Sequence, residues 1–220
     1  MPHVVLLGDS IFDNQSYVQP GEPDVIHQLR AQLPAGWHAT LLAIDGSLIA
    51  DVPHQLAHLP TDTTHLVISA GGNDALAHLN VLDEPATSVA QALMHLATLQ
   101  DQFEQSYRRM LATILTHSLP TAVCTIYNGN FPSPVYQRLT TLGAAIYDDV
   151  ILRLAVEHNL PVLDLRLICA DPADYANPIE PSARGGDRIA RAIALLLTTH
   201  DFSVRATTVY ASGSMTDPAP

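Results

Sequence analysis

Residues 4–14 read Val4-Val5-Leu6-Leu7-Gly8-Asp9-Ser10-Ile11-Phe12-Asp13-Asn14, and this stretch organises the rest of the chain. A β-branched and leucine run that ends in Gly-Asp-Ser predicts a buried parallel strand that carries a serine hydroxyl to the carboxyl edge of a sheet. Open α/β sheets bind their ligands at that edge. The same residues also suit a plain turn, because aspartate and serine are common helix caps. The stretch therefore predicts either a functional serine or a cap.

Further apolar runs alternate with segments of helical periodicity. The predicted strands are residues 4–7, 38–44, 65–69, 121–126 and 161–165, and the predicted helices are residues 25–33, 48–59, 88–117, 135–158 and 182–199. In the third helix, the apolar residues from Val89 to Ile114 form one face. Each strand leads into a helix, which implies right-handed crossovers and helices on both faces of the sheet. We predict an α/β fold with five parallel strands in the flavodoxin-like order 2-1-3-4-5.

The length and charge of the chain restrict its organisation and its partners. A chain of 220 residues predicts one domain, over residues 1–200, and the loss of apolar periodicity after His200 predicts a flexible tail over residues 201–220. The formal charge of −12 comes from 10 Lys plus Arg against 22 Asp plus Glu. This charge repels phosphate backbones, so it argues against nucleic acid and anionic membrane surfaces as partners.

Cysteine usage and the first residues predict the compartment. Cys124 and Cys169 lie in apolar contexts without metal-ligand spacing, so we expect two buried thiols. We find no basic leader and no apolar segment long enough for export or for a membrane span. We therefore expect a cytoplasmic protein without a membrane span. A glycine-rich phosphate cradle is missing from the sequence, and we expect no cofactor and no metal.

Three loops at the predicted carboxyl edge carry Ser10, Gly46 and Asn73. In acyl transfer a serine attacks a carbonyl carbon, and preplaced donors must stabilise the oxyanion that develops. A glycine backbone N–H and an asparagine amide can supply those donors. Each residue alone is a common turn residue, so the prediction of an acyl-transfer site depends on their joint placement at one sheet edge.

The order of Gly8-Asp9-Ser10, then Gly46, then Gly71-Gly72-Asn73-Asp74 resembles the SGNH hydrolases, also called the GDSL-like esterase/lipase family. The resemblance covers roughly residues 3 to 199 and implies a three-layer α/β/α sandwich. It also implies that Ser10 is the nucleophile. The oxyanion hole would consist of the Ser10 backbone N–H, the Gly46 N–H and the Asn73 side chain. The implied substrate is a small-molecule acyl ester.

The sequence departs from the family pattern at the last motif, Asp-x-x-His before the final helix. Asn177 stands in the place of the aspartate, and Glu180 stands in the place of the histidine. A carboxylate of ordinary pKa is a much weaker base than a neutral imidazole, so Glu180 can replace the histidine only if burial raises its pKa. Asn177 can orient Glu180 by donating a hydrogen bond. A salt bridge from Arg184 would instead keep Glu180 ionised and favour a structural or ligand-orienting role.

Other residues near the predicted edge have alternative interpretations. His78 follows Asn73 by five residues and either turns toward the same edge or lies on the surface. His54 and His58 are one turn apart, and a solvated helix face explains them better than half a metal site. Tyr17 and the loop over residues 127–134 follow strand ends, where they either border a cleft or are only partly buried.

Two functions compete on this sequence. The first is a hydrolase of the SGNH type that cleaves a carboxylic ester through Ser10, with the oxyanion hole from Gly46 and Asn73 and with Glu180 in the position of the base. The alternative is a catalytically weak or inactive protein of the same fold that binds a small acylated or hydroxylated ligand. Fluorophosphonate labelling of Ser10 separates the two.

Overall fold

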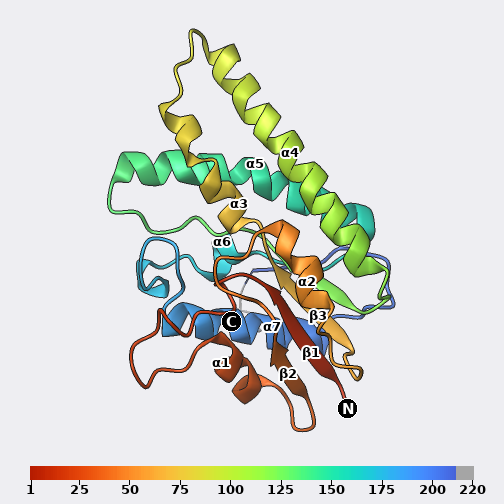
Figure 1. The fold of residues 1–220 in the computed structure, drawn as a ribbon. Helices are drawn as coiled ribbons and strands as arrows, with labels where there is room; N and C mark the ends of the chain where they lie inside the picture. Colours follow the sequence, from red (N-terminus) through yellow and green to blue (C-terminus); the bar gives the residue numbers. More distant parts are fainter. Residues whose placement is uncertain (212–220) are drawn as a thin grey trace, which may run out of the picture.

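The computed structural model describes residues 1–211 and contains a parallel sheet between two layers of helices (Figure 1). The six strands pair in the order β2-β1-β3-β4-β5-β6, and every pair is parallel. The strands are β1 (His3–Gly8), β2 (His38–Leu41), β3 (His65–Ser69), β4 (Thr121–Cys124), β5 (Val162–Leu163) and β6 (Val209–Tyr210). The predicted α/β/α architecture and the order 2-1-3-4-5 are confirmed.

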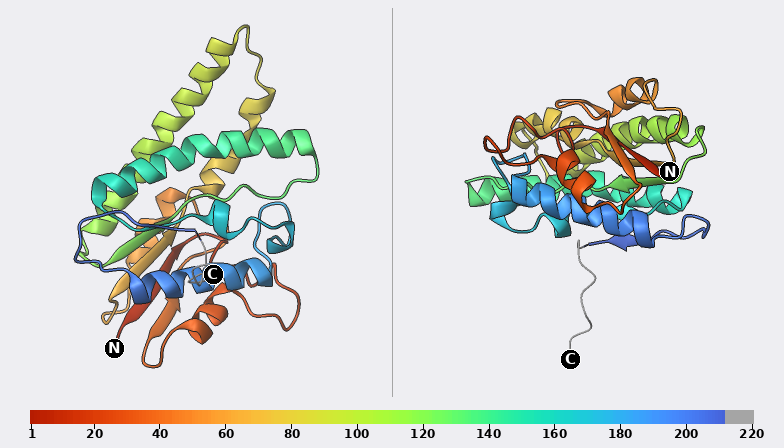
Figure 2. Two further views of the ribbon diagram at one scale, coloured as in Figure 1. Left: turned by 180° about the vertical axis from the view of Figure 1, so that it is seen from behind. Right: turned by 90° about the horizontal axis from the view of Figure 1, so that it is seen from below.

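Seven α-helices and three 3-10 turns of residues 1–211 connect the strands. The helices are α1 (Val25–Gln32), α2 (Val52–Leu56), α3 (Gly72–Ala77), α4 (Val89–Leu115), α5 (Pro134–His158), α6 (Leu165–Ile168) and α7 (Ala183–Thr199). The 3-10 turns are η1 (Ile49–Asp51), η2 (Leu79–Asp83) and η3 (Pro172–Asp174). Helices α1 and α7 pack together on one face of the sheet, and α2, α4 and α5 cover the other (Figures 1 and 2).

Strand β1 lies inside the sheet and is buried on both faces. Val4 and Leu6 point into the core under α1 and α7, whereas Val5 and Leu7 point into the core under α2, α4 and α5. All four side chains are 0% exposed. Burial on both faces explains why this strand is a continuous apolar run without polar alternation.

Several element boundaries differ from the predictions. The strand predicted over residues 38–44 ends at Leu41, and the helix predicted over residues 48–59 is divided into η1 and α2. Strand β6 lies inside the predicted flexible tail and pairs with β5. The prediction of five strands therefore missed a sixth. The part of the predicted tail from residue 212 onward lies outside the described residues.

The first half of α4 does not pack on the sheet, in contrast to the apolar face predicted for the whole helix. Val89 and Leu93 are 79% and 59% exposed, and the buried face begins only at Phe103. Figure 1 shows this half of α4 extending beyond the sheet, with α3 and α5 nearby. In residues 1–211 no helix has an apolar stretch long enough to cross a membrane.

A buried carboxyl group holds the loop that follows β4. Asp148 of α5 is 1% exposed, and its Oδ1 accepts a hydrogen bond of 2.8 Å from the Ile126 backbone N–H. Its Oδ2 has no hydrogen-bond partner among residues 1–211, and Arg166 Nη1 lies 3.7 Å from it. Burial raises the pKa of Asp148 from 3.8 to about 7. The folded state therefore holds this proton more tightly than the unfolded state, and the resulting stability is lost as the pH rises from about 4 to about 7.

Asp148→Asn is expected to remove that loss. The free energy of unfolding of the variant minus that of the unchanged protein should increase by about 3 kcal/mol when the pH is raised from 4.5 to 8. Urea unfolding at both pH values measures the difference. The matched control is Asp101→Asn, because Asp101 lies on the exposed side of α4. An equal pH dependence in the two variants would contradict the assignment of the effect to the buried carboxyl.

Candidate active site

Ser10 lies two residues beyond the end of β1 and is 6% exposed. The turn that carries it is closed by the Asp9 carbonyl, which accepts hydrogen bonds of 3.1 Å from the backbone N–H groups of Phe12 and Asp13. The buried side chain of Gln55 fixes the last residue of β1, since it forms two hydrogen bonds of 2.8 Å with the Gly8 backbone. The serine hydroxyl therefore lies on a turn that the sheet and α2 both restrain.

A cavity of about 120 Å³ opens beside Ser10 at the carboxyl edge of the sheet. Asp9, Ser10, Asn73 and Glu180 line one end of it, and most of the remaining lining is apolar. The loop after β4 contributes Tyr127, Asn128, Gly129 and Phe131, as the placement after a strand end predicts. Tyr17 is not a lining residue, and its hydroxyl donates a hydrogen bond of 2.8 Å to Asp45.

Asn73 lies in the first turn of α3 and faces the loop after β2. Its Nδ2 donates a hydrogen bond of 2.9 Å to the Ser47 carbonyl, and the next residue, Asp74, accepts one of 3.0 Å from the Ile49 N–H. These bonds fix the loop over residues 46–49 next to the cavity. Gly46 has a φ of +78°, is exposed and does not line the cavity. Its role as an oxyanion donor stays a prediction.

Glu180 is a buried carboxylate beside Ser10. It is 5% exposed, it lines the cavity, and its Oε2 has no hydrogen-bond partner in the part of the chain that the structure describes. Burial raises the pKa of Glu180 from 4.5 to about 7, against the opposing effect of a hydrogen bond with the Ser10 side chain. Burial thus shifts the pKa of Glu180 in the direction that a general base at neutral pH requires, and its role as the base stays a prediction.

Asp9 is a second carboxyl group with a raised pKa at the same end of the cavity. Burial raises its pKa to about 7, and the negative charges of Glu180 and Asp74 add to the increase. Its Oδ1 accepts a hydrogen bond of 3.2 Å from the Ile11 N–H, so it also forms the local turn expected of an aspartate at this position. Asp9 and Glu180 together give the site two carboxyl groups that exchange protons near neutral pH.

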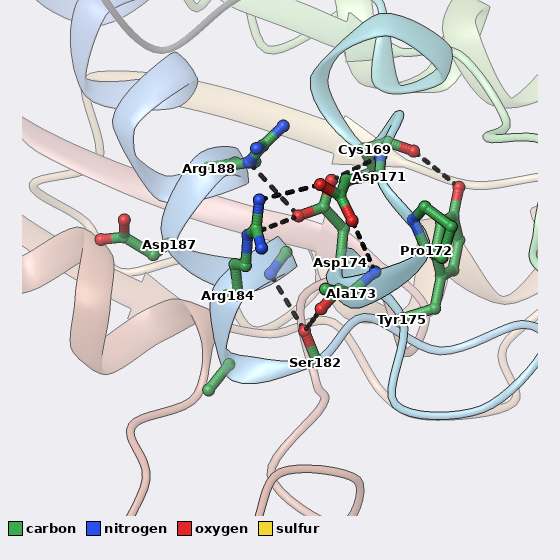
Figure 3. Close-up of polar contacts among 12 residues, drawn as sticks. Cys169, Asp171, Pro172, Ala173, Asp174, Tyr175, Ser182, Arg184, Asp187 and Arg188 are labelled. Atoms are coloured by element: carbon green, nitrogen blue, oxygen red, sulfur yellow. Dashed lines mark hydrogen bonds and ion pairs between the residues drawn. The ribbon is translucent and has the colours of Figure 1, made fainter.

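An ion-pair network holds the chain that leads to Glu180 (Figure 3). Asp174 is fully buried, and its Oδ1 lies 3.4 Å from Arg184 Nε and 3.2 Å from Arg188 Nε. Arg184 also pairs with Asp171 at 3.0 Å. Among residues 1–211 Arg184 therefore pairs with Asp171 and Asp174, and the salt bridge considered between Arg184 and Glu180 is wrong.

Two hydrogen bonds that the sequence analysis did not predict support the turn that carries Glu180. Asn14 Nδ2 donates a hydrogen bond of 3.2 Å to the Pro181 carbonyl, and the Tyr127 hydroxyl donates one to the Ile179 carbonyl. Asn14 follows Ser10 by four residues, so it connects the serine loop to the glutamate loop. No local motif marks either contact, since both bridge segments far apart in the sequence.

Asn177 shapes the same turn from the outside. Its side chain is exposed, it does not line the cavity, and its Oδ1 accepts a hydrogen bond of 2.9 Å from the Ile179 N–H. Asn177 therefore does not join Ser10, Asn73 and Glu180 at the cavity, and its predicted role in orienting Glu180 stays a prediction.

The histidine nearest to the site is part of the cavity wall. His78 lines the cavity, and its Nδ1 lies 3.2 Å from the Tyr147 hydroxyl, with the two rings stacked. Of the two alternatives for His78, the structure favours the one in which its side chain turns toward the site. His54 and His58 are exposed, as a solvated face requires.

Comparisons with solved structures confirm the fold. An extracellular lipase from Streptomyces rimosus is 17% identical with a TM-score of 0.63, and 91% of this chain and 100% of that chain are covered. A phospholipase A1 from Streptomyces albidoflavus NA297 is 16% identical with a TM-score of 0.62, over 91% and 99% of the two chains. A carbohydrate acetylesterase, Est24 from Sinorhizobium meliloti, is 15% identical with a TM-score of 0.61, over 90% and 99%.

A comparison with curated proteins found no match. A profile of the GDSL-like Lipase/Acylhydrolase family matches residues 6–188, which include the serine turn, the Asn73 segment and the turn that carries Glu180. The resemblance noted in the motifs is thereby confirmed. Because this match spans most of the chain, the protein belongs to the GDSL-like lipase/acylhydrolase family.

Proposed function

We propose that this protein is a serine acylhydrolase that cleaves a carboxylic ester, with Ser10 as the nucleophile and Glu180 as the general base. The observation that carries the proposal is the buried pair itself, in which a serine hydroxyl and a carboxylate with a pKa of about 7 share the end of an apolar cavity. The family supports a small-molecule ester as the substrate.

In the proposed reaction the Ser10 Oγ attacks the ester carbonyl carbon while its proton passes to Glu180. The oxyanion of the tetrahedral intermediate accepts hydrogen bonds from the Asn73 side chain and from the backbone N–H groups of Ser10 and Gly46. Collapse breaks the bond to the alcohol oxygen, and Glu180 returns the proton to the leaving alcohol. A water molecule then attacks the acyl-serine while Glu180 takes its proton, and Glu180 gives that proton to Ser10 Oγ as the acyl–serine bond breaks, which restores the serine and releases the carboxylic acid.

Burial is what suits Glu180 to this role. A carboxylate with a pKa of 4.5 takes a proton from serine far less readily than one with a pKa of about 7. At pH 7 a group with that pKa is about half ionised and half protonated, so it can accept the serine proton and later return it. The environment thus gives a carboxylate the proton affinity that the family pattern obtains from a histidine.

Labelling with a fluorophosphonate tests the proposal directly. We expect mass addition of one adduct per chain, on Ser10, and no adduct on Ser10→Ala. The unchanged protein should also hydrolyse p-nitrophenyl acetate faster than Ser10→Ala does. If Ser10 stays unmodified and the two proteins turn over the ester equally slowly, the hydrolase proposal is wrong, and a ligand-binding protein of this fold becomes the better description.

We further propose a cytoplasmic location and no role for nucleic acid. The free thiols of Cys124 and Cys169 are buried, which suits a reducing compartment. The charge of −12 opposes binding to phosphate backbones.

A further inference from the structure

The cavity beside Ser10 continues away from the catalytic end, between two helical walls. One wall is formed by α3 and η2, and the other by the first half of α5. The first wall contributes Leu76, Leu79, Val81 and Leu82, and the second contributes Leu139, Gly143, Ala144 and Ile146. Of the described residues 1–211, Asp9 and Glu180 are the only carboxylates that line the cavity, and no Lys or Arg lines it. The two helical walls therefore present mainly aliphatic side chains to the cavity.

The polar side chains on these walls are occupied by contacts within the protein. The Thr140 hydroxyl donates a hydrogen bond of 3.0 Å to the Tyr136 carbonyl, and the Tyr147 hydroxyl lies 3.2 Å from His78 Nδ1. A ligand rich in hydroxyl groups would therefore lose its hydrogen bonds to water and gain few in return. A hydrocarbon chain loses nothing of that kind.

Gly143 keeps this part of the cavity open. It is the one glycine of the 25-residue helix α5, where glycine costs roughly 1 kcal/mol relative to alanine. A Cβ atom built on Gly143 meets no atom within 4 Å, so close packing of another segment does not explain the glycine. Its effect is to leave open space on the cavity wall beside Ala144.

The far end of the cavity reaches the surface through an apolar rim. Leu82 of η2 and Leu139 of α5 both line the cavity, and they are 36% and 43% exposed. The exposed surface next to Leu139 on α5 is also apolar, since Val135 and Leu142 are 72% and 69% exposed. The exposed part of the cavity lining on η2 and α5 is thus apolar.

We propose that this cavity binds the acyl chain of the ester, as a linear chain of about four to eight carbons that passes Gly143 toward the rim. An apolar cavity of about 150 Å³ holds a six-carbon ring, and this one is smaller, about 120 Å³, which suits a slimmer linear chain. The inference rests on the proposed hydrolase function, and it names the substrate class as medium-chain rather than acetyl esters.

The first test compares p-nitrophenyl hexanoate with p-nitrophenyl acetate. Each buried methylene should raise kcat/KM by about fourfold, so we expect the hexanoate to be preferred at least tenfold. Gly143→Leu places a side chain in the open space and should reduce the preference ratio at least tenfold. Ala145→Leu places the same side chain on the exposed side of α5, where it adds three carbons rather than four, and should keep the ratio. A flat chain-length profile together with a rapid acetate reaction would overturn the acyl-chain site and leave the hydrolase function standing.

The second test does not depend on catalysis. Titration calorimetry with 1-hexanol should show binding to the unchanged protein and to Ala145→Leu, and at least tenfold weaker binding to Gly143→Leu. Equal binding to all three proteins, or none to the unchanged protein, would overturn the site. If no ester is hydrolysed and Ser10 is not labelled, the hydrolase function fails, and the 1-hexanol result still decides whether the cavity takes an alkyl chain.

Discussion

Glu180→Gln is expected to lower kcat/KM for p-nitrophenyl esters at pH 8 by about 10³-fold, within the range of 10²–10⁴ that general acid–base catalysis contributes. Glutamine keeps the size of the side chain and its place in the turn after Asn177, but it cannot accept the serine proton. The variant should approach the rate of Ser10→Ala, which sets the floor of the assay. Thermal unfolding shows whether the fold is unchanged.

The pH dependence of the unchanged protein also tests whether Glu180 is the base. It avoids the danger that a substitution disturbs the fold. A base acts only when it is ionised, and the pKa of Glu180 is about 7. We therefore expect kcat/KM to rise with pH and to be about tenfold lower at pH 6 than at pH 8. Because Asp9 titrates in the same range, the profile reports the pair of carboxyl groups. In Glu180→Gln this rise should disappear.

Two further variants test which residue acts as the general base. Glu180→His restores the residue type of the family pattern at this position and should raise activity above that of Glu180→Gln, and above that of the unchanged protein if the oxyanion donors are in place. His78→Gln tests the histidine that, among residues 1–211, lines the cavity. If His78→Gln removes activity and Glu180→Gln does not, the base is His78 and our assignment of Glu180 is wrong.

The parts of the fold that depend on local pattern were predictable. Strand β3 and helix α5 begin and end within one residue of the expected positions, because a buried apolar run and a long apolar period have few competing interpretations. The first half of α4 has the same period, yet Val89 and Leu93 on its apolar face stay exposed, because periodicity shows that a face is apolar and not what covers it. Strand β6 is two residues long, too short to leave a pattern.

The candidate site was predictable as far as its motifs go. Ser10 and Asn73 lie at the cavity because both follow strands of one parallel sheet. The pKa of Glu180 was not predictable, since it depends on burial by segments far away in the sequence. For the same reason the sequence suggested Arg184 as its partner, whereas Asp171 and Asp174 bind that arginine.

Gly8→Ala is expected to destabilise the protein by at least about 4 kcal/mol, at the upper end of the effects of single substitutions. Gly8 has a φ of +126°, and a Cβ atom there would lie 1.7 Å from the Ser69 carbonyl oxygen. That oxygen belongs to the paired strand β3 and accepts a hydrogen bond of 3.1 Å from the Asp9 N–H. To make room, β1 must move away from β3 just before Ser10. This movement would also disturb the two hydrogen bonds between the Gly8 backbone and the Gln55 side chain.

The control separates steric overlap from backbone strain. Gly21 has a φ of +90°, and a Cβ atom there meets nothing within 4 Å, so Gly21→Ala carries the strain of a left-handed residue alone, roughly 1–2 kcal/mol. Urea unfolding of both variants gives the two losses, and the excess in Gly8→Ala measures the close approach of β1 to β3. If both variants lose the same free energy of unfolding, β3 moves aside at no energetic cost. The explanation of Gly8 by close strand packing would then be wrong. If the excess is found, the glycine of Gly8-Asp9-Ser10 serves the geometry of the strand, and the serine reaches the cavity only because this residue has no side chain.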